Sequence, residues 1–281
     1  MIQAAQTDPA AYAAVGTEIA VALCGLWLLW VYVLSPNAPK AERRLPEWQL
    51  PPVDFACYAF CAIVSYLLLS SVAGLVLRYV HLKADAAAVL GGAVQDIGLL
   101  VGIFGFHRFY TRGARSANAR PVILGAIKSG AITFFIAMAL VDLTEIAWGY
   151  ALTKLGLPME NQEMVDVLQN AKSPWVKGSL MGIAVVLAPI TEEIVFRGGL
   201  FRYFRTRIPR WLAIGLTSAL FGALHVTWSN LSGLPSFAPL AVLAAVFCLA
   251  YERTGLISTT IVAHAMFNTF TFLLVVMGLH A

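Results

Sequence analysis

The sequence has few charged residues. Of its 281 residues, 12% are charged and 59% are hydrophobic, whereas soluble globular proteins carry about 25% charged residues. A disordered chain, a collagen-like fibre and a soluble two-domain enzyme are therefore excluded, because each has a different composition. The net charge of +4 does not indicate a nucleic-acid partner, since basic residues in such a chain usually mark loops on one side of a membrane. We expect the partner to be a lipid bilayer.

Cysteine is also scarce. The four cysteines all lie in apolar runs, and none forms a CxxC or Cys/His pattern with metal-ligand spacing. This excludes a small disulfide scaffold, and we expect the cysteines to be small apolar packing residues. They are Cys24, Cys57, Cys61 and Cys248.

Long apolar runs fill most of the chain. A membrane-spanning helix needs about 20 mostly apolar residues, and eight runs are candidates for such helices. They cover residues 13–34, 55–77, 86–106, 122–150, 177–201, 211–230, 237–251 and 256–279. The sequence therefore predicts an all-α fold, a polytopic transmembrane bundle of about eight helices.

Basic residues are absent before Lys40 and then recur in alternate loops. The amino terminus lacks the basic region of a cleaved secretory signal, so we expect the first helix to be retained. The basic loops lie at residues 40–44, 108–120 and 202–210 and at Arg253. The positive-inside rule places these loops in the cytoplasm and both termini outside, in an integral multi-pass membrane protein.

Three of the predicted helices carry polar side chains at positions where the bilayer tolerates few of them. The fifth contains EEIVFR at 192–197, the sixth ends in FGALH at 221–225, and the eighth contains HAMFN at 264–268. Counted along each helix from the nearest basic marker, these groups lie about 17–22 Å deep. Their common depth predicts one polar cavity near the middle of the bilayer.

The spacing within the motifs suggests roles. Glu193 and Arg197 are four residues apart, with the acid nearer the amino terminus, which favours an ion pair. Adjacent helical residues point about 100° apart, so Glu192 is left as the less compensated carboxylate and is a candidate general base. His264 and Asn268 are also four apart and are candidate hydrogen-bond donors to an oxyanion.

The three motifs together resemble the CAAX protease and bacteriocin-processing family of glutamate-type intramembrane proteases, which includes the Ras-converting CAAX endopeptidases. The family pattern is EExxxR, then FxxxH, then HxxxN, each on its own transmembrane helix, and all three are intact here. The resemblance covers about residues 175–279. It implies a protease core at 175–281, preceded by N-terminal transmembrane helices of unassigned role at 1–174.

The resemblance also implies a role for each motif. Glu192 and His225 would activate the attacking water, and His264 and Asn268 would stabilise the oxyanion of the tetrahedral intermediate. The substrate would be a membrane-anchored, lipidated or leader peptide, and the membrane would be the plasma (inner) membrane of a bacterium. Which substrate is cleaved, and in what oligomeric state, stays open.

Behind these four residues, the resemblance implies that Glu193 and Arg197 brace the site, and that neither a metal nor another cofactor takes part. A zinc-dependent membrane protease is an alternative, because two histidines and a glutamate can ligate a catalytic metal. The sequence contains no HExxH motif.

Two further interpretations remain. His264 and Asn268 alone are equally well explained as an interhelical hydrogen-bonding pair. A proton- or ion-coupled transporter would use carboxylates within apolar spans, such as Asp96, Asp142 and Glu145. Against this alternative, no inverted repeat is visible in the sequence.

Overall fold

The described residues form helices joined by turns. The structure is a computed structural model, and it describes residues 9–39, 45, 48–80, 83–110, 123–160, 167–168 and 170–276. Most of the predicted basic loops at 40–44 and 108–120 lie outside these ranges. The helices are α1 (Pro9–Leu29) with η1 (Trp30–Leu34), α2 (Pro52–Tyr79), α3 (Ala84–Tyr110), α4 (Ile123–Leu155), α6 (Pro174–Gly182), η2 (Ile183–Leu187), α7 (Ala188–Glu193), η3 (Ile194–Phe201), α8 (Arg202–Arg205), α9 (Arg210–Ala223), α10 (Leu234–Thr254) and α11 (Ile257–Val276).

Within the described ranges, seven helical segments are long and apolar enough to cross a membrane. The segments from α6 to α8 follow one another without a break and count as a single span, Pro174–Arg205. The predicted all-α polytopic bundle is thus confirmed, and the chain is an integral multi-pass membrane protein. The predicted span at 237–251 is longer than expected, since α10 covers Leu234–Thr254.

The predicted helix at 211–230 is wrong in its second half. Helix α9 has 14 residues and ends at Ala223. Residues 224–233 form turns, in which Leu231 and Gly233 have positive φ angles of 61° and 80°. Such angles are incompatible with a continuing right-handed helix. His225 therefore lies in the turn that follows α9 and not on the helix itself.

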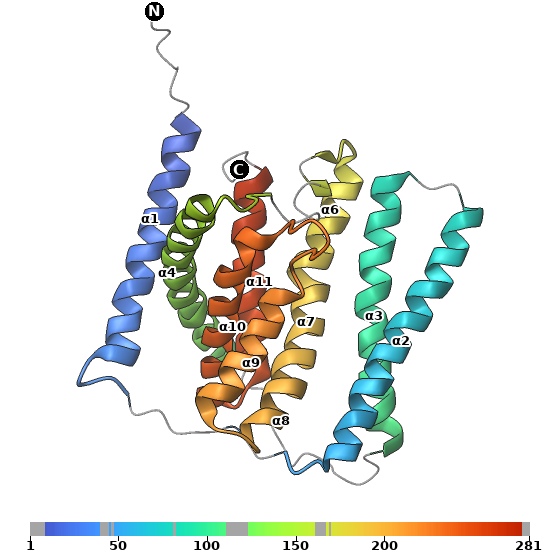
Figure 1. Ribbon diagram of the computed structural model, residues 1–281. Helices are drawn as coiled ribbons and strands as arrows, with labels where there is room; N and C mark the ends of the chain where they lie inside the picture. The colour runs from blue at the N-terminus through green and yellow to red at the C-terminus, as the bar shows by residue number, and fades with distance from the viewer. Residues whose placement is uncertain are drawn as a thin grey trace, which may run out of the picture.

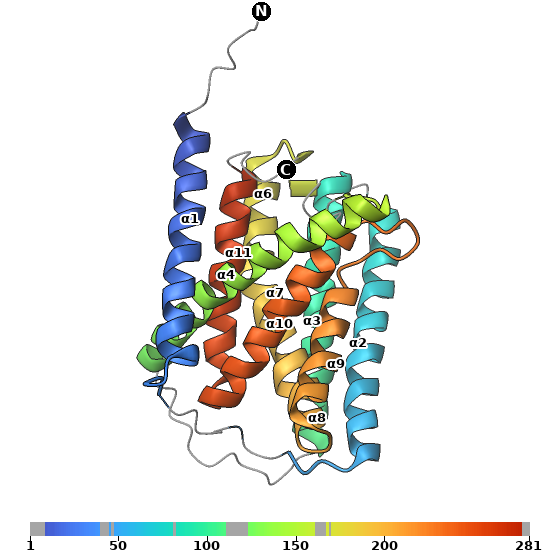
Figure 2. The ribbon, with the colours of Figure 1, turned by 60° about the vertical axis from the view of Figure 1, so that its left-hand side comes forward.

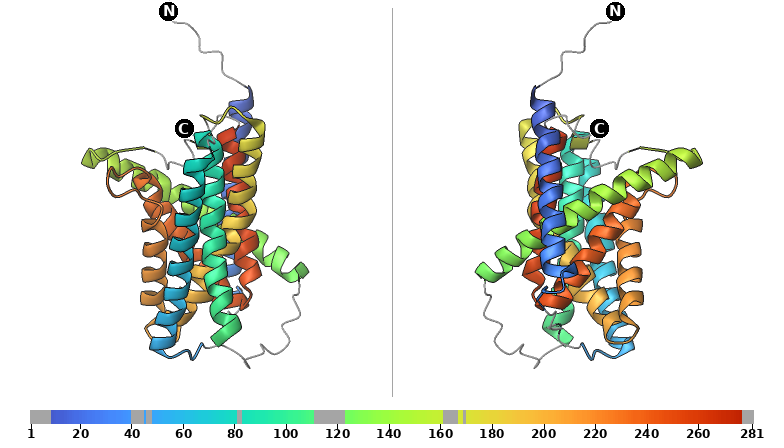
Figure 3. Two further views of the ribbon diagram at one scale, coloured as in Figure 1. Left: turned by 90° about the vertical axis from the view of Figure 1, so that its right-hand side faces the viewer. Right: turned by 90° about the vertical axis from the view of Figure 1, so that its left-hand side faces the viewer.

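The helices form a bundle with two peripheral parts (Figure 1). Helix α4 crosses α10 and α11 at a steep angle, and α1 packs against the outside of α4 (Figures 2 and 3). Helices α2 and α3 form a hairpin on the other side, where α3 contacts α6, η2 and α7. The helices that carry the three motifs, α7, α9 and α11, lie between these two parts.

The basic residues of several loops gather at one end of the bundle. The junction of α8 with α9 and the junction of α10 with α11 lie at the same end (Figure 1). There Arg205 and Arg210 each bind Glu252 through their Nε atoms at 2.6 Å. Arg253 donates a hydrogen bond to the carbonyl of Tyr32 at the end of the first span. The arginines of these two junctions therefore lie at the same end of the bundle, the arginine-rich end, as the alternation of basic loops predicts.

A buried apolar core fixes the position of α11. Leu28 of α1, Phe134 of α4, Phe247 of α10 and Phe267 of α11 belong to one cluster of buried side chains. Gly130 of α4 allows α11 to approach closely, since a Cβ atom there would lie 2.7 Å from the Val262 side chain. The face of α11 that carries the HAMFN motif is thereby held toward the rest of the bundle.

Candidate active site

The two glutamates lie on α7, which is only six residues long. Wide π-helical turns flank it on both sides, η2 before and η3 after it. Such turns inside a helix are rare and occur frequently at functional sites. Pro189, in the first turn of α7, has no N–H group to donate to the preceding turn. The backbone that carries the glutamates is thus irregular on both sides.

Glu193 is the fully buried member of the pair. Its Oε1 atom lies 3.1 Å from Nη1 of Arg197 and 2.9 Å from Nδ1 of His264. The side chains of Glu193 and Arg197 are both 0% exposed, so the predicted ion pair forms. His264 comes from α11, 71 residues later in the chain. Glu193 therefore joins the diglutamate helix to α11 through a charged contact that water does not reach.

Glu192 has different surroundings. Its side chain is 24% exposed, and its Oε2 atom lies 3.7 Å from Nε2 of His264, which is longer than a hydrogen bond. Among the residues that the structure describes, this buried Oε2 atom has no hydrogen-bond partner. One imidazole therefore faces both carboxylates, and it binds Glu193 more closely than Glu192.

Arg197 is enclosed by aromatic rings. Its guanidinium lies 4.9 Å from the ring of Phe221 on α9 and 5.2 Å from that of Phe247 on α10. Its Nη2 atom also points to the carbonyl of Ala244 at 3.4 Å. A cation over an aromatic face is stabilised by about 2 kcal/mol or more when it is desolvated. Arg197 thus connects three helices as well as neutralising Glu193.

His225 is fixed by its own turn. Its Nδ1 atom lies 2.8 Å from the carbonyl oxygen of Phe221. A carbonyl only accepts, so Nδ1–H is the donor and Nε2 of the neutral ring keeps its lone pair. The Phe221 ring lies between the two histidines, 4.8 Å from His225 and 6.1 Å from His264. Among the described residues, His225 is therefore linked to the glutamate cluster through this ring and not by a hydrogen bond to Glu192.

Asn268 is also held in place. Its Nδ2 atom donates a hydrogen bond of 2.6 Å to the carbonyl of Ala184 in η2. The amide nitrogen carries two hydrogens, so one N–H remains for another acceptor. The structure therefore brings Glu192, Glu193, Arg197 and His264 into direct contact, with His225 and Asn268 on the flanking segments.

Asp96, one of the carboxylates that a transporter would use, lies on the same side of the bundle as Glu192. Leu99 and Ile103 of α3 pack in one cluster with Ile194, and both helices run from the upper to the lower end in Figure 1. The preceding turn of α3, which holds Asp96, thus lies opposite the preceding turn of the glutamate helix. The two carboxylates interact electrostatically. In contrast, Glu145 is exposed on α4.

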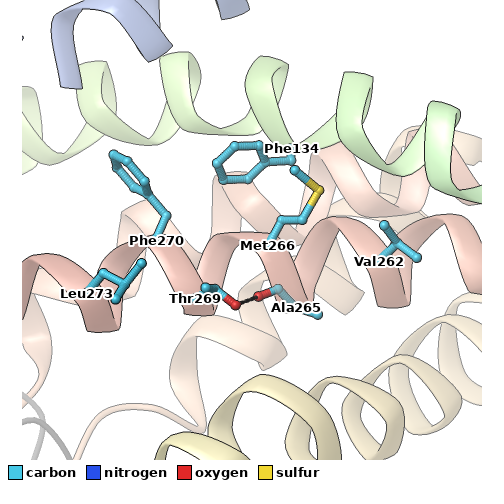
Figure 4. Close-up of a pocket in the computed structure, with 7 residues that line it drawn as sticks. All are labelled: Phe134, Val262, Ala265, Met266, Thr269, Phe270 and Leu273. Carbon is cyan, nitrogen blue, oxygen red and sulfur yellow. Dashed lines mark hydrogen bonds between the residues drawn. The ribbon is translucent and has the colours of Figure 1, made fainter. Parts of the chain in front are cut away.

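A cavity of about 410 Å³ lies between α4 and α11 (Figure 4). Its lining is almost wholly apolar, and the hydroxyl of Thr269 is turned back to the carbonyl of Ala265. These residues lie on the side of α11 opposite His264 and Asn268, because successive helical residues are about 100° apart. The lining residues are Phe134, Val262, Ala265, Met266, Thr269, Phe270 and Leu273.

Within the described part of the chain, no three His, Cys, Asp or Glu side chains are grouped so that they could hold a metal ion.

Comparison with known proteins gives a family match over the same region. Residues 174–270 match the family model described as type II CAAX prenyl endopeptidase Rce1-like. The match includes all three motifs, because it begins at the start of α6 and ends within α11. No solved structure matches this chain.

Three curated proteins are similar over longer stretches. The UPF0177 protein YbdI of Lactococcus lactis subsp. lactis (strain IL1403) is 30% identical over 39% of this chain and 55% of its own length. An uncharacterized 24.3 kDa protein of Escherichia coli is 30% identical over 50% of this chain and 63% of its own. The UPF0177 protein YaiF of the same Lactococcus strain is 26% identical over 68% of this chain and 80% of its own. The chain thus spans less than two thirds of the first two relatives.

The matched region and the contacting motifs agree. The EExxxR and HxxxN motifs meet through Glu193 and His264, and the FxxxH motif packs its phenylalanine against Arg197. Over residues 174–270, the chain is thus similar to the Rce1-like family of type II CAAX prenyl endopeptidases.

Proposed function

We propose that this chain is a glutamate-type intramembrane endopeptidase, which hydrolyses a peptide bond of a membrane-associated or lipidated protein or peptide. One observation carries the proposal. Of two adjacent glutamates, Glu193 is 0% exposed and paired with Arg197 at 3.1 Å, whereas Glu192 is 24% exposed and lies 3.7 Å from its nearest charged partner, His264. A carboxylate at membrane depth that is accessible and incompletely paired is suited to accept a proton from water.

In this proposal, Glu192 and the free Nε2 of His225 hold the attacking water between them. As the water oxygen bonds to the carbonyl carbon of the substrate, Glu192 takes its proton. The carbonyl π-electrons move to oxygen and form an oxyanion. When the intermediate collapses, the C–N bond breaks and the protonated Glu192 delivers the proton to the leaving amine.

The oxyanion would be bound by two donors from α11. His264 gives its Nδ1–H to Glu193, so its Nε2 donates toward the substrate when the ring is protonated. The second N–H of Asn268, which the carbonyl of Ala184 leaves free, would be the other donor. Prearranged donors of this kind typically contribute a factor of about 10²–10³ each to kcat.

Glu193 and Arg197 would act behind the reacting atoms. The Glu193 carboxylate would fix the ring of His264 at 2.9 Å, and Arg197 would provide the counter-charge for that carboxylate at a position that water does not reach. Removing either partner would leave an uncompensated buried charge. They would therefore affect the rate indirectly, by holding His264 in the orientation that the reaction needs.

We further propose that residues 175–281 form the protease core, with 1–174 as an N-terminal set of helices, of which α4 packs on α10 and α11. The arginine-rich end of the bundle would face the cytoplasm of a bacterium, in its plasma (inner) membrane, with both termini outside. The substrate would enter from the lipid or from the cytoplasmic side, as a membrane-anchored, lipidated or leader peptide.

The proposal is tested with the purified full chain in detergent. The probes are a quenched fluorescent peptide that ends in a farnesylated cysteine and three further residues, the same peptide with a palmitoyl anchor, and an unlipidated leader-like peptide. We expect cleavage of at least one probe, and its loss in Glu192→Ala and His225→Ala. Full activity in either variant, or cleavage of none of the probes by the wild-type chain, would contradict the proposal.

The alternatives have distinct outcomes in the same preparation. Activity that disappears with a chelator and returns with added zinc would replace the glutamate mechanism with a metal-dependent one. Solute uptake into proteoliposomes that depends on Asp96 or Glu145 would indicate a transporter. The proposal requires instead that cleavage persists in the chelator.

A further inference from the structure

We infer that Pro189 is a positioning residue for Asn268. The wide turn that precedes Pro189 leaves the carbonyl of Ala184 without a donor from its own helix, and this carbonyl then orients the Asn268 amide. The catalytic consequence rests on the proposed function, whereas the structural part does not.

The helical register identifies the unpaired carbonyl. In an α-helix, the carbonyl of Ala184 would accept from the N–H four residues later, on Ala188. In η2 that N–H instead binds the carbonyl of Ile183, five residues back. The next N–H in a π-helical register would belong to residue 189, but proline has none. The Ala184 carbonyl is therefore left for a partner outside the helix.

Proline also explains why the turn is wide. In a regular helix, the ring of Pro189 would clash with the carbonyl of Val185, four residues earlier. Widening the turn before the proline relieves this clash. A free carbonyl inside a membrane is costly, because no water is present to bind it. Asn268 satisfies the carbonyl of Ala184 at 2.6 Å.

The bond sets the direction of the amide. The –NH₂ group of Asn268 is planar, so the hydrogen that binds Ala184 fixes the direction of the second one. Ala184 precedes Glu192 by eight residues on the same continuous helical rod. The helical span that carries the proposed base, Glu192, thus also orients the proposed oxyanion donor, Asn268, although Asn268 belongs to another helix.

The first test compares two proline variants. Pro189→Ala restores an N–H and allows a regular register, so the Ala184 carbonyl regains a donor from its own helix, which competes with the Asn268 amide and no longer requires it. We expect kcat on the cleaved probe to fall about ten- to hundredfold with KM within about twofold. Pro239→Ala is the matched control, since Pro239 is a buried proline inside the membrane helix α10. It should leave kcat and KM within about twofold of the wild-type values.

The second test is a double-mutant cycle, which needs no substrate. Asn268→Ala should lower the unfolding temperature in detergent by about 2–4 °C in the wild-type chain, because the Ala184 carbonyl loses its partner. In the Pro189→Ala background, the same change should shift it by less than about 1 °C. For cleavage, Pro189→Ala with Asn268→Ala should have the same kcat as Asn268→Ala alone.

The outcomes separate this inference from the proposed function. Full kcat in Pro189→Ala, together with impaired cleavage in Asn268→Ala, would overturn the inference and leave the function in place. Equal losses of unfolding temperature from Asn268→Ala in both backgrounds would overturn it without reference to activity. Full activity of Asn268→Ala would overturn the oxyanion role itself, and with it the catalytic part of the inference.

Discussion

Two adjacent residues of the same type have opposite environments. The Glu193 side chain is 0% exposed and contacts both Arg197 and His264. The Glu192 side chain is 24% exposed, and its Oε2 atom lies 3.7 Å from Nε2 of His264. Because neighbouring helical residues point about 100° apart, Glu193 turns into the bundle and Glu192 toward a more accessible side of the helix. The proposed roles of Glu193 as the bracing carboxylate and Glu192 as the reacting one rest on this difference.

Glu193→Gln should destabilise the protein. The change leaves the buried guanidinium of Arg197 without its counter-charge, which typically costs about 3–5 kcal/mol. We expect a clearly lower unfolding temperature in detergent, accompanied by loss of cleavage. Glu192→Gln, at an accessible position, should unfold at the wild-type temperature. A wild-type unfolding temperature for Glu193→Gln would show that Arg197 is neutralised by another group.

The sequence predicts only part of this site. The pairing of Glu193 with Arg197 follows from a spacing of four residues on one helix. The bond from His264 to Glu193 spans 71 residues, and that from Asn268 to Ala184 spans 84. Such contacts depend on how the helices are rotated and shifted against each other. Motif spacing brings the two α11 residues to one helical face but does not reveal that each already has a partner.

At the scale of elements, the shortness of α9 determines where His225 lies. Apolar composition alone predicts a helix at 211–230, whereas α9 ends at Ala223. The turn-forming residues at 229–233, where Gly233 adopts a φ of 80°, argue against a helix that runs to 230, but they do not mark its end at Ala223. Because the helix stops early, His225 can return its Nδ1–H to the carbonyl of Phe221.

Gly222 should be sensitive to enlargement. It lies between Phe221 and His225, and a Cβ atom there would be 2.5 Å from the backbone oxygen of Phe237 on α10. Gly222→Ala should therefore push the end of α9 away from α10, at a cost of about 1–3 kcal/mol, and reduce cleavage by displacing His225. Thermal unfolding and kcat are the measurements.

Gly215 of the same helix is the matched control, because nothing lies within 4 Å of its Cβ position. Gly215→Ala should keep full activity and be neutral or slightly stabilising, by up to about 1 kcal/mol, since alanine favours a helix. Equal effects of the two substitutions would contradict the close α9–α10 contact.

At the scale of the whole molecule, charge and apolar length were sufficient to predict the architecture. All-α topology, repeated spans and the grouping of arginines at one end follow from composition and from the alternation of basic loops. The position of Asp96 could not be predicted, because it depends on how the α2–α3 hairpin docks beside the glutamate helix. Asp96 lies near enough to Glu192 to be affected by its charge, so α3, in the N-terminal half of the chain, places a carboxylate close to the site.

The orientation of the bundle is open to a direct check. In a chain whose natural cysteines are replaced, we expect Ser229→Cys to react with a membrane-impermeant maleimide on intact bacterial cells. Asn37→Cys, at the arginine-rich end, should react only after the cells are permeabilised. Both positions are exposed. The reverse labelling pattern would place the arginine-rich loops outside and contradict the proposed topology.

The central claim is that Glu192 performs the chemistry and its neighbour does not. The most direct measurement is kcat of purified Glu192→Gln on a probe that the wild-type chain cleaves, with a chelator present and with the unfolding temperature recorded for both proteins. We predict a fall in kcat of about 10²–10⁴ at an unchanged unfolding temperature. A Glu192→Gln protein that cleaves the probe at the wild-type rate would contradict the account.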